Sequence, residues 1–267
     1  MTTLEVRDVT KVYKLRSGFR SADLRAVDGV SFRLEPGRTT ALVGQSGSGK
    51  STIAKMLMHL ERPTSGQILV DGAPVGRGRR AEVAYRSQVQ MVFQDPFGSL
   101  NPYHSVGHHL ERPVRLHHPR LGDTEVRERV LALLRRVRLD PAEDYAQRRP
   151  HELSGGQRQR VAIARALAPE PGILVADEPV SMLDVSIRLG VLNLLASLQE
   201  EDDLGVLYIT HDLATARHFS DEILVMHRGT IVERGPADDV ILRPQHDYTK
   251  TLRAASPDPE RRLAELS

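Results

Sequence analysis

Short apolar runs alternate with segments of helical periodicity along much of the chain. Continuous apolar runs, as expected for strands buried inside a parallel sheet, occupy residues 39–43, 173–176 and 206–209. Apolar residues at helical spacing occur between and after these runs, at residues 50–60, 154–167, 186–199 and 212–219. This β/α order predicts an α/β fold built around a parallel sheet.

Further strands are expected near both ends of the chain. Residues 4–9 alternate between apolar and polar positions, and residues 27–34 resemble a second strand before a Pro-Gly turn. Near the C-terminus, two apolar runs flank residues 227–229 and predict a short hairpin over residues 223–233. The polar segment that follows is predicted to be partly helical.

The middle of the chain departs from this pattern. Residues 77–86 contain few apolar positions and predict a surface excursion, which a strand follows at 89–93. Residues 98–152 are rich in His, Arg and Pro, and their clearest pattern is a helix over 124–137 with Thr124 as its N-cap. The apolar face of this helix consists of Val126, Val130, Leu133, Leu134 and Val137. We therefore expect a helical insertion in the α/β core.

The composition limits the classes of function. The 267 residues suffice for one elaborated domain or two small ones. Lys and Arg number 37 against 35 Asp and Glu, and this balance gives no support for nucleic-acid binding. Because the chain has no cysteine, it can hold neither a disulfide nor an iron–sulfur cluster. It also has no apolar run of about 18 residues and no signal-peptide core, so we expect a soluble chain.

Residues 44–51 carry the most specific chemical signal. They read Gly-Gln-Ser-Gly-Ser-Gly-Lys-Ser and fit the phosphate-loop pattern G-x-x-x-x-G-K-[ST]. Glycines let the backbone wrap around an anion, Lys50 reaches the β- and γ-phosphates, and the Ser51 hydroxyl can hold Mg²⁺. The loop joins a predicted strand to a predicted helix, so a helix N-terminus points at the phosphates. We expect the nucleotide to be bound by Gly44, Gln45, Ser46, Gly47, Ser48, Gly49, Lys50, Ser51 and Thr52.

Two carboxylates form the second half of the expected site. Asp177 and Glu178 directly follow the apolar run at 173–176. An aspartate at a strand end can hold Mg²⁺, and the neighbouring glutamate can act as general base toward an attacking water. Acidic residues often end strands without any such role, and it is the matched phosphate loop that makes the catalytic interpretation strong.

A second motif, Leu153-Ser154-Gly155-Gly156-Gln157, opens a predicted helix and offers another anion clamp at a helix N-terminus. Together with the phosphate loop, it makes residues 4–253 resemble the nucleotide-binding subunit of an ATP-binding-cassette (ABC) transporter. The resemblance implies a P-loop NTPase (RecA-like) core with an N-terminal antiparallel β subdomain and a helical signature subdomain at about 98–165. The ATPase domain would span residues 1–253, and residues 254–267 would form a C-terminal tail.

The resemblance also implies roles for single residues. Tyr13 would stack on adenine, although residues 14–25 look inserted and a surface aromatic is the alternative. Gln94 would touch Mg²⁺ and sense the membrane subunit, and His211 would contact the γ-phosphate. In this family, the signature residues Ser154, Gly155, Gly156 and Gln157 grip ATP bound to the opposite subunit, and the loop containing Asp184 links the two sites. Met182 departs from the family pattern, in which alanine is commoner at this position.

Two longer segments indicate a branch of the family. Residues 94–102 and 244–250 resemble the di/oligopeptide and nickel importer branch. The resemblance implies an importer of di- or oligopeptides, with nickel or another solute as the alternative cargo. The implied cofactors are ATP and Mg²⁺. The implied partners are integral membrane permease subunits, a second ATPase subunit (a paralogue or the same chain) and an external solute-binding protein. These partners would hold the chain at the cytoplasmic face of the membrane, and no nucleic acid is expected.

Other classes of protein account for less of the sequence. Chromosome and repair ATPases carry a similar clamp, but they separate its motifs with long heptad arms, which this chain lacks. Translation-associated relatives carry two cassettes in one chain. A small kinase or GTPase would leave residues 153–157 unexplained.

Overall fold

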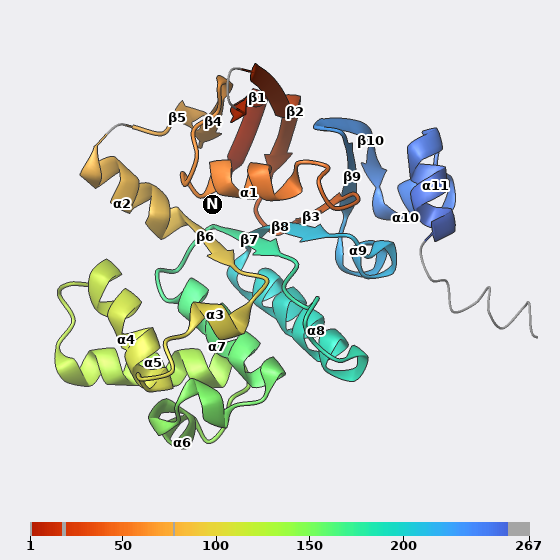
Figure 1. Ribbon diagram of the computed structural model, residues 1–267. Coiled ribbons are helices and arrows are strands. Elements are labelled where there is room, and N and C mark those ends of the chain that lie inside the picture. The colour runs from red at the N-terminus through yellow and green to blue at the C-terminus, as the bar shows by residue number, and fades with distance from the viewer. Residues whose placement is uncertain (1, 18–19, 77, 256–267) are drawn as a thin grey trace, which may run out of the picture. The chain divides into compact units, whose positions relative to one another are not determined.

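The computed structural model describes residues 2–17, 20–76 and 78–255. The chain forms two compact units (Figure 1). Residues 3–74 and 206–267 make up the phosphate-loop unit, and residues 1–2 and 75–205 make up the helical unit. No helix in the described part of the chain is both long and apolar enough to cross a bilayer.

One sheet of the phosphate-loop unit is antiparallel. Its strands follow the order β2-β1-β4-β5, with β1 at Leu4–Ser17, β2 at Arg20–Leu34, β4 at Ser65–Val70 and β5 at Ala73–Pro74. β1 and β2 are longer than the sequence pattern predicts, and residues 14 and 25, the ends of the expected insertion, lie within these strands. The insertion therefore lengthens a hairpin, as the pairing of Tyr13 with Leu24 shows.

The second group of strands in this unit positions the phosphate loop. β3 (Thr39–Val43) pairs in parallel with β8 (Gly205–Thr210) and β9 (Glu222–His227), and β10 (Thr230–Pro236) pairs antiparallel with β9. All five residues of β3 are buried, which agrees with the apolar run. The predicted C-terminal hairpin is therefore confirmed.

Four helices complete the phosphate-loop unit: α1 at Lys50–Leu57, α9 at Leu213–Phe219, α10 at Ala237–Leu242 and α11 at Asp247–Ala255. α1 ends three residues before the predicted end, because His59 adopts a left-handed conformation with φ of 54°. α10 and α11 confirm that the C-terminal segment is partly helical. Of the predicted tail, residues 254 and 255 end α11, and residues 256–267 lie outside the described part.

The helical unit contains a parallel strand pair and most of the helices. β6 (Val89–Val92) pairs in parallel with β7 (Ile173–Asp177). The α-helices are α2 at Arg79–Gln88, α3 at Pro96–Ser99, α4 at Val106–His117, α5 at Asp123–Arg136, α6 at Ala142–Gln147, α7 at Gly155–Leu167 and α8 at Val185–Asp202. A 3₁₀ turn at Pro150–Glu152 precedes α7. Helices α4, α5 and α6 contact one another and form the predicted insertion (Figure 1).

The helical unit adds one element to the predictions and corrects another. Residues 79–88 form the helix α2, which the sequence pattern does not predict; most of its residues are exposed, as expected for a surface excursion, and Tyr85 is buried. α5 starts at Asp123 with Gly122 as its N-cap, so Thr124 lies inside the first turn. Glu125 fixes this start because its carboxylate accepts a hydrogen bond from the Gly122 amide at 2.7 Å. The predicted apolar face of α5 is buried as expected.

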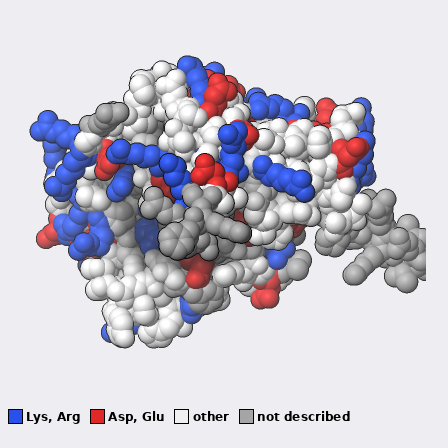
Figure 2. All heavy atoms as spheres, turned by 45° about the horizontal axis from the view of Figure 1, so that its top comes forward, with Lys and Arg blue, Asp and Glu red and all other residues white. Residues whose placement is uncertain are grey.

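The exposed charges are mixed in sign. Figure 2 shows Lys and Arg side chains close to Asp and Glu side chains on the face that it presents. Near the end of α5, Arg135 pairs with Glu143 at 2.6 Å and Arg136 pairs with Asp202 at 2.5 Å. Acidic neighbours therefore partly neutralise these two arginines, which is typical of a solvated helix face.

Candidate active site

The phosphate loop follows β3 in a tightly packed conformation. Gly44 has φ of 156°, and a Cβ atom there would lie 2.3 Å from the Met226 carbonyl oxygen. Gly49 has φ of 112°, and a Cβ atom there would lie 2.4 Å from the Ala26 carbonyl oxygen. Only glycine fits at these two positions, so the backbone itself forms the wall of the loop.

The Lys50 side chain lies inside the loop and binds its backbone. Its side chain is 6% exposed, and Nζ donates to the carbonyl oxygens of Gly44 at 2.6 Å and Gln45 at 3.1 Å. Lys50 is also the first residue of α1, whose N-terminus attracts anions. A buried ammonium group beside helix amides is suited to binding the phosphates of a nucleotide.

The hydroxyl groups around Lys50 add polar atoms to the loop. The Ser48 hydroxyl is buried and has no hydrogen-bond partner among the described residues. Ser51 is exposed and Thr52 is half-buried in the first turn of α1. An unsatisfied buried hydroxyl is costly, so Ser48 fits a loop that contributes polar groups to a ligand.

Tyr13 reaches the same helix. Its hydroxyl donates to Glu61 at 2.5 Å and also forms a hydrogen bond with Thr52. The Lys11 ammonium lies 5.1 Å from the centre of the Tyr13 ring. Burial raises the pKa of the Tyr13 hydroxyl, and the bond to Glu61 raises it further. The contact with Thr52 places Tyr13 beside the phosphate loop, and adenine stacking stays a prediction.

His211 lies at the carboxyl end of β8, the strand that pairs with β3. β3 and β8 are parallel, and Val43 pairs with Thr210 in their register. Gly44 and His211 therefore each follow the last residue of adjacent strands. Asp212 then caps α9 by accepting hydrogen bonds from Ala214 N–H at 2.9 Å and Thr215 N–H at 3.3 Å, and His211 itself is exposed.

In the helical unit, the structure joins two residues that the sequence placed 84 positions apart. Gln94 Nε2 donates to Glu178 Oε2 at 3.1 Å. Glu178 follows Asp177, the last residue of β7, and has φ of 45°. Ser181 holds this turn because its amide and hydroxyl both donate to the Glu178 carbonyl oxygen, at 3.2 and 3.0 Å. Ser181 thus fixes the Glu178 backbone, and Gln94 fixes the Glu178 carboxylate.

The signature motif is built as a capped helix start. Ser154 is the exposed N-cap of α7, and its hydroxyl accepts from the Gln157 amide at 3.3 Å while Gln157 Oε1 accepts from the Ser154 amide at 2.9 Å. Gln157 Nε2 also donates to the Tyr145 hydroxyl at 2.9 Å. The sequence does not reveal Tyr145, because this residue of α6 meets Gln157 only in the folded chain, where α6 packs against α4 and α5.

Gly155 and Gly156 begin α7, and the second glycine packs tightly. A Cβ atom at Gly156 would lie 2.4 Å from Ile187 Cγ2 in α8. This close packing explains why glycine is needed at position 156 independently of any phosphate. Asp184 is exposed at the N-cap of the same helix α8.

The residues predicted to hold Mg²⁺ have suitable chemistry. Ser51, Gln94 and Asp177 offer a hydroxyl, an amide oxygen and a carboxylate, which are the hard oxygen ligands that Mg²⁺ prefers. Glu178 adds a carboxylate beside Gln94. Among the described residues no cluster of three or more His, Asp or Glu side chains forms a metal site of its own.

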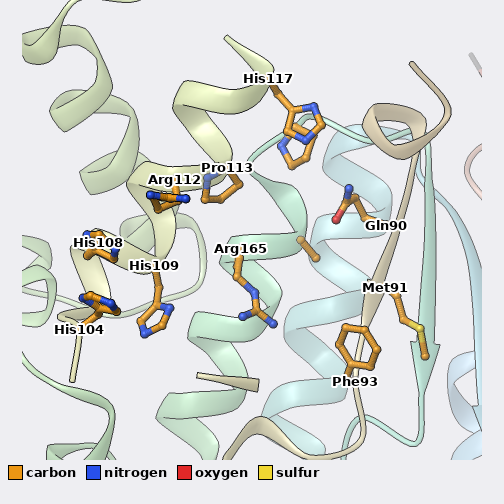
Figure 3. Close-up of a pocket in the computed structure, with 12 residues that line it drawn as sticks. Gln90, Met91, Phe93, His104, His108, His109, Arg112, Pro113, His117 and Arg165 are labelled. Carbon is orange, nitrogen blue, oxygen red and sulfur yellow. The ribbon is translucent and has the colours of Figure 1, made fainter. Parts of the chain in front are cut away.

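The helical unit also has a cavity of about 570 Å³ lined by basic side chains (Figure 3). His104, His108 and His109 lie on one side of it, and Arg165 projects from α7. The His104 and His108 rings stack at 4.1 Å. Burial lowers the pKa of His109, and it also lowers the pKa of His117, another lining residue.

The α/β fold and the phosphate loop define a nucleotide-binding protein of the P-loop class. The chain matches the ABC transporter family over residues 27–181, and it belongs to this family. The resemblance predicted from the motifs is therefore confirmed.

Several curated proteins resemble the chain over most of its length. The di/tripeptide transport ATP-binding protein DppF of Pseudomonas aeruginosa is 46% identical over 259 residues, which cover 96% of this chain and 79% of that protein. The oligopeptide transport ATP-binding protein OppF of Escherichia coli is 44% identical over 263 residues, which cover 96% of this chain and 78% of that protein.

Solved structures support the predicted fold class. CbiO1 from Clostridium perfringens, part of the ABC transporter complex cbiONQ, has a TM-score of 0.79 at 27% identity, covering 98% of this chain and 97% of that chain. The ATP-binding cassette MJ0796, solved as a dimer in a post-hydrolysis state with ADP and Pi, has a TM-score of 0.76 at 32% identity. That alignment covers 88% of this chain and 98% of the MJ0796 chain.

Proposed function

We propose that the chain hydrolyses ATP to ADP and phosphate as an ATPase subunit of a membrane importer whose cargo is di- or oligopeptides. The observation that carries the ATPase activity is the Lys50 ammonium, buried within the phosphate loop and 2.6 Å from the Gly44 oxygen. The cargo class is supported by relatives named for di/tripeptide and oligopeptide transport.

The predicted site residues divide the work of binding and hydrolysis in this proposal, and Gln94 takes part in two of its steps. Lys50 and the loop amides hold the β- and γ-phosphates, and His211 contacts the γ-phosphate. Glu178 accepts the proton of the attacking water as general base. Gln94 orients the Glu178 carboxylate through the 3.1 Å hydrogen bond. Tyr13 stacks on adenine. Ser51, Gln94 and Asp177 would hold Mg²⁺, which when bound would neutralise charge on the phosphates.

The signature helix acts on a second subunit. Ser154 is exposed at the N-terminus of α7, and its hydroxyl and the amides of the first turn are suited to an anion. In the proposed dimer, Ser154, Gly155, Gly156 and Gln157 bind the γ-phosphate of ATP held by the partner subunit. Asp184 belongs to the loop that links the two sites. The second subunit is a paralogue or another copy of this chain.

The permease subunits dock on the helical unit at the cytoplasmic face of the membrane, and an external solute-binding protein selects the cargo. The cavity of Figure 3 is lined by residues of α4 and α7 and by Gln90, Met91 and Phe93 in and after β6. Tyr103 is 84% exposed in the turn before α4. The proposed docking surface consists of Gln94 and the helical insertion of about 98–152, which includes the histidines of this cavity and the exposed Tyr103 ring.

Reconstitution with the membrane partners tests the whole proposal. The subunit is copurified with its permeases and placed in liposomes, and ATPase activity is measured with peptides, Ni²⁺ or other solutes and the cognate binding protein. Stimulation by di- or oligopeptides supports the proposal, and stimulation by Ni²⁺ alone contradicts the cargo class.

The docking surface is tested separately in the same system. Tyr103→Ala should reduce stimulated turnover more than basal turnover. Cross-links from α11 instead of the Tyr103 turn would contradict the docking surface.

A further inference from the structure

The segment at 244–250, which resembled an importer branch but received no role, contacts the phosphate loop. The Gln45 amide N–H donates to the Tyr248 hydroxyl at 3.0 Å. These residues are 203 positions apart, and both belong to the phosphate-loop unit. The first residue after Gly44 is therefore tied to α11.

Tyr248 is itself firmly placed. Its ring stacks on His227, with ring centres 3.8 Å apart and an angle of 31° between the planes. Its amide donates to His246 Nδ1 at 3.1 Å. Glu233 of β10 accepts hydrogen bonds from the amides of Gln245 at 2.7 Å and His246 at 3.0 Å, which fasten the start of the segment. Thr249 and Leu252 anchor α11 itself, since both are buried.

The turn that follows His227 also contacts the phosphate loop. β9 ends at His227, and after the turn the Gly229 amide donates to the Ser48 carbonyl oxygen at 2.9 Å. The Met226 carbonyl oxygen lies 2.3 Å from the position that a Cβ atom on Gly44 would take. The β9–β10 hairpin and Tyr248 thus support the loop at three successive places, which are Gly44, Gln45 and Ser48.

Gln45 links Tyr248 to the phosphate-binding lysine. The Gln45 carbonyl oxygen accepts from Lys50 Nζ at 3.1 Å and from the Ser48 amide at 3.2 Å. The residue whose N–H is held by Tyr248 therefore uses its C=O to hold Lys50. Movement of Gln45 would displace an acceptor of the ammonium group that binds phosphate.

We propose that Tyr248 is a positioning residue for nucleotide binding: its hydroxyl fixes Gln45 and thereby the phosphate loop. The inference rests on the proposed ATP-binding function and assigns the 244–250 segment a part in it. Because Tyr248 acts through the backbone of Gln45, we expect its hydroxyl to affect the affinity for ATP and ADP alike.

The test compares two full-length variants that each lose one hydroxyl from α11. Tyr248→Phe keeps the ring on His227 and removes the acceptor of the Gln45 amide. Thr251→Val is the matched control, because the Thr251 hydroxyl donates to the Asp247 carbonyl oxygen at 2.9 Å within the same helix. Dissociation constants for Mg-ATP and Mg-ADP are measured by titration calorimetry. We expect Tyr248→Phe to weaken both by about 2- to 12-fold, the factor for one hydrogen bond, and Thr251→Val to leave both unchanged.

Hydrogen exchange provides a readout without nucleotide. The exchange rate of the Gln45 amide, followed by NMR, should rise in Tyr248→Phe and not in Thr251→Val, because only the former loses its acceptor. Wild-type affinities in Tyr248→Phe, equal losses in both variants, or an unchanged Gln45 exchange rate would each overturn the inference. A wild-type chain that binds no nucleotide would instead refute the proposed function, and the exchange rates would still show whether Tyr248 holds the loop.

Discussion

Gln94 and Glu178 are joined by a hydrogen bond of 3.1 Å between Nε2 and Oε2. The two residues follow adjacent parallel strands, since Val92 pairs with Ala176. An amide donor beside the proposed general base keeps the carboxylate in one orientation without supplying a competing charge. The residue that is expected to sense the permease therefore touches the residue that is expected to activate water.

Glu178→Gln should keep ATP binding and slow hydrolysis by about 10²–10⁴-fold, the usual contribution of a positioned general base. This corresponds to about 3–5.5 kcal/mol of barrier. The amide can still accept the Gln94 hydrogen bond, but it cannot take a proton from water. Phosphate release measures the rate, and light scattering with Mg-ATP should show a persistent dimer in the presence of the partner subunit.

Glu170→Gln is the matched control for this change. Glu170 lies in the same unit, also has a positive φ, of 58°, and its ion pair with Arg129 is on the surface. Its ATPase rate should equal that of the wild type. Normal turnover in Glu178→Gln would remove Glu178 from the mechanism, and an inactive variant that never dimerises would contradict the proposed dimer, in which ATP is bound between two subunits.

Lys50→Ala should weaken ATP binding by about 100-fold or more, because it removes a buried cation that makes charge-assisted hydrogen bonds. Lys55→Ala, at the last turn of the same helix, removes an exposed charge and should bind ATP normally. Equilibrium binding to both variants gives the comparison. Similar affinities for the two would show that Lys50 does not hold the phosphates.

The loop and the order of strands were predictable because each depends on a local pattern. Glycine spacing determines where a backbone can wrap around phosphate, and a short continuous apolar run predicts a buried strand. α2 was missed because its buried side is little more than Tyr85, so no apolar stripe reveals the helix. The start of α5 was misplaced because Gly122 has no capping side chain, and the cap comes from Glu125.

The contacts that complete the site depend on tertiary structure. Tyr248 reaches Gln45 across 203 positions, and Tyr145 reaches Gln157 only through the packing of α6. No periodicity or spacing in the sequence encodes such pairs. The motif at 244–250 was visible as a family resemblance, but its contact with the phosphate loop required the fold.

Gly156→Ala should destabilise the helical unit by about 1–3 kcal/mol, the usual cost of overpacking. The new Cβ atom would lie 2.4 Å from Ile187 Cγ2, and a β-branched side chain on a helix has little freedom to move away. Denaturant titration measures the loss. Adding Ile187→Ala removes the opposing methyl group and should restore most of the stability. Failure of that second change to restore it would show that the cost has another origin.

Acidification should destabilise the helical unit in a pH range set by two half-buried histidines, His109 and His117. Burial lowers the pKa values of His109 and His117 below the ordinary 6.5, so the unfolded chain binds these protons more readily. Their stability contribution is complete above pH 6.5 and is lost as pH falls below it. His109→Gln with His117→Gln should flatten the unfolding free energy between about pH 7 and 5, and an unchanged slope would contradict the assignment.

Ser154→Arg should leave the ATP affinity of the isolated subunit intact and stop hydrolysis by the dimer. Ser154 is exposed at the start of α7 and belongs to the helical unit, whereas Lys50 belongs to the phosphate-loop unit. A bulky side chain at the clamp should therefore block only closure on the partner's γ-phosphate. Ser105→Arg is the control, because Ser105 caps α4 by accepting from the His108 amide at 3.2 Å, so both variants lose one N-cap. We expect Ser105→Arg to lose similar stability but keep basal ATPase activity. If Ser154→Arg lost monomer ATP affinity as severely as Lys50→Ala, the clamp would act on its own subunit and the proposed action in trans would be wrong.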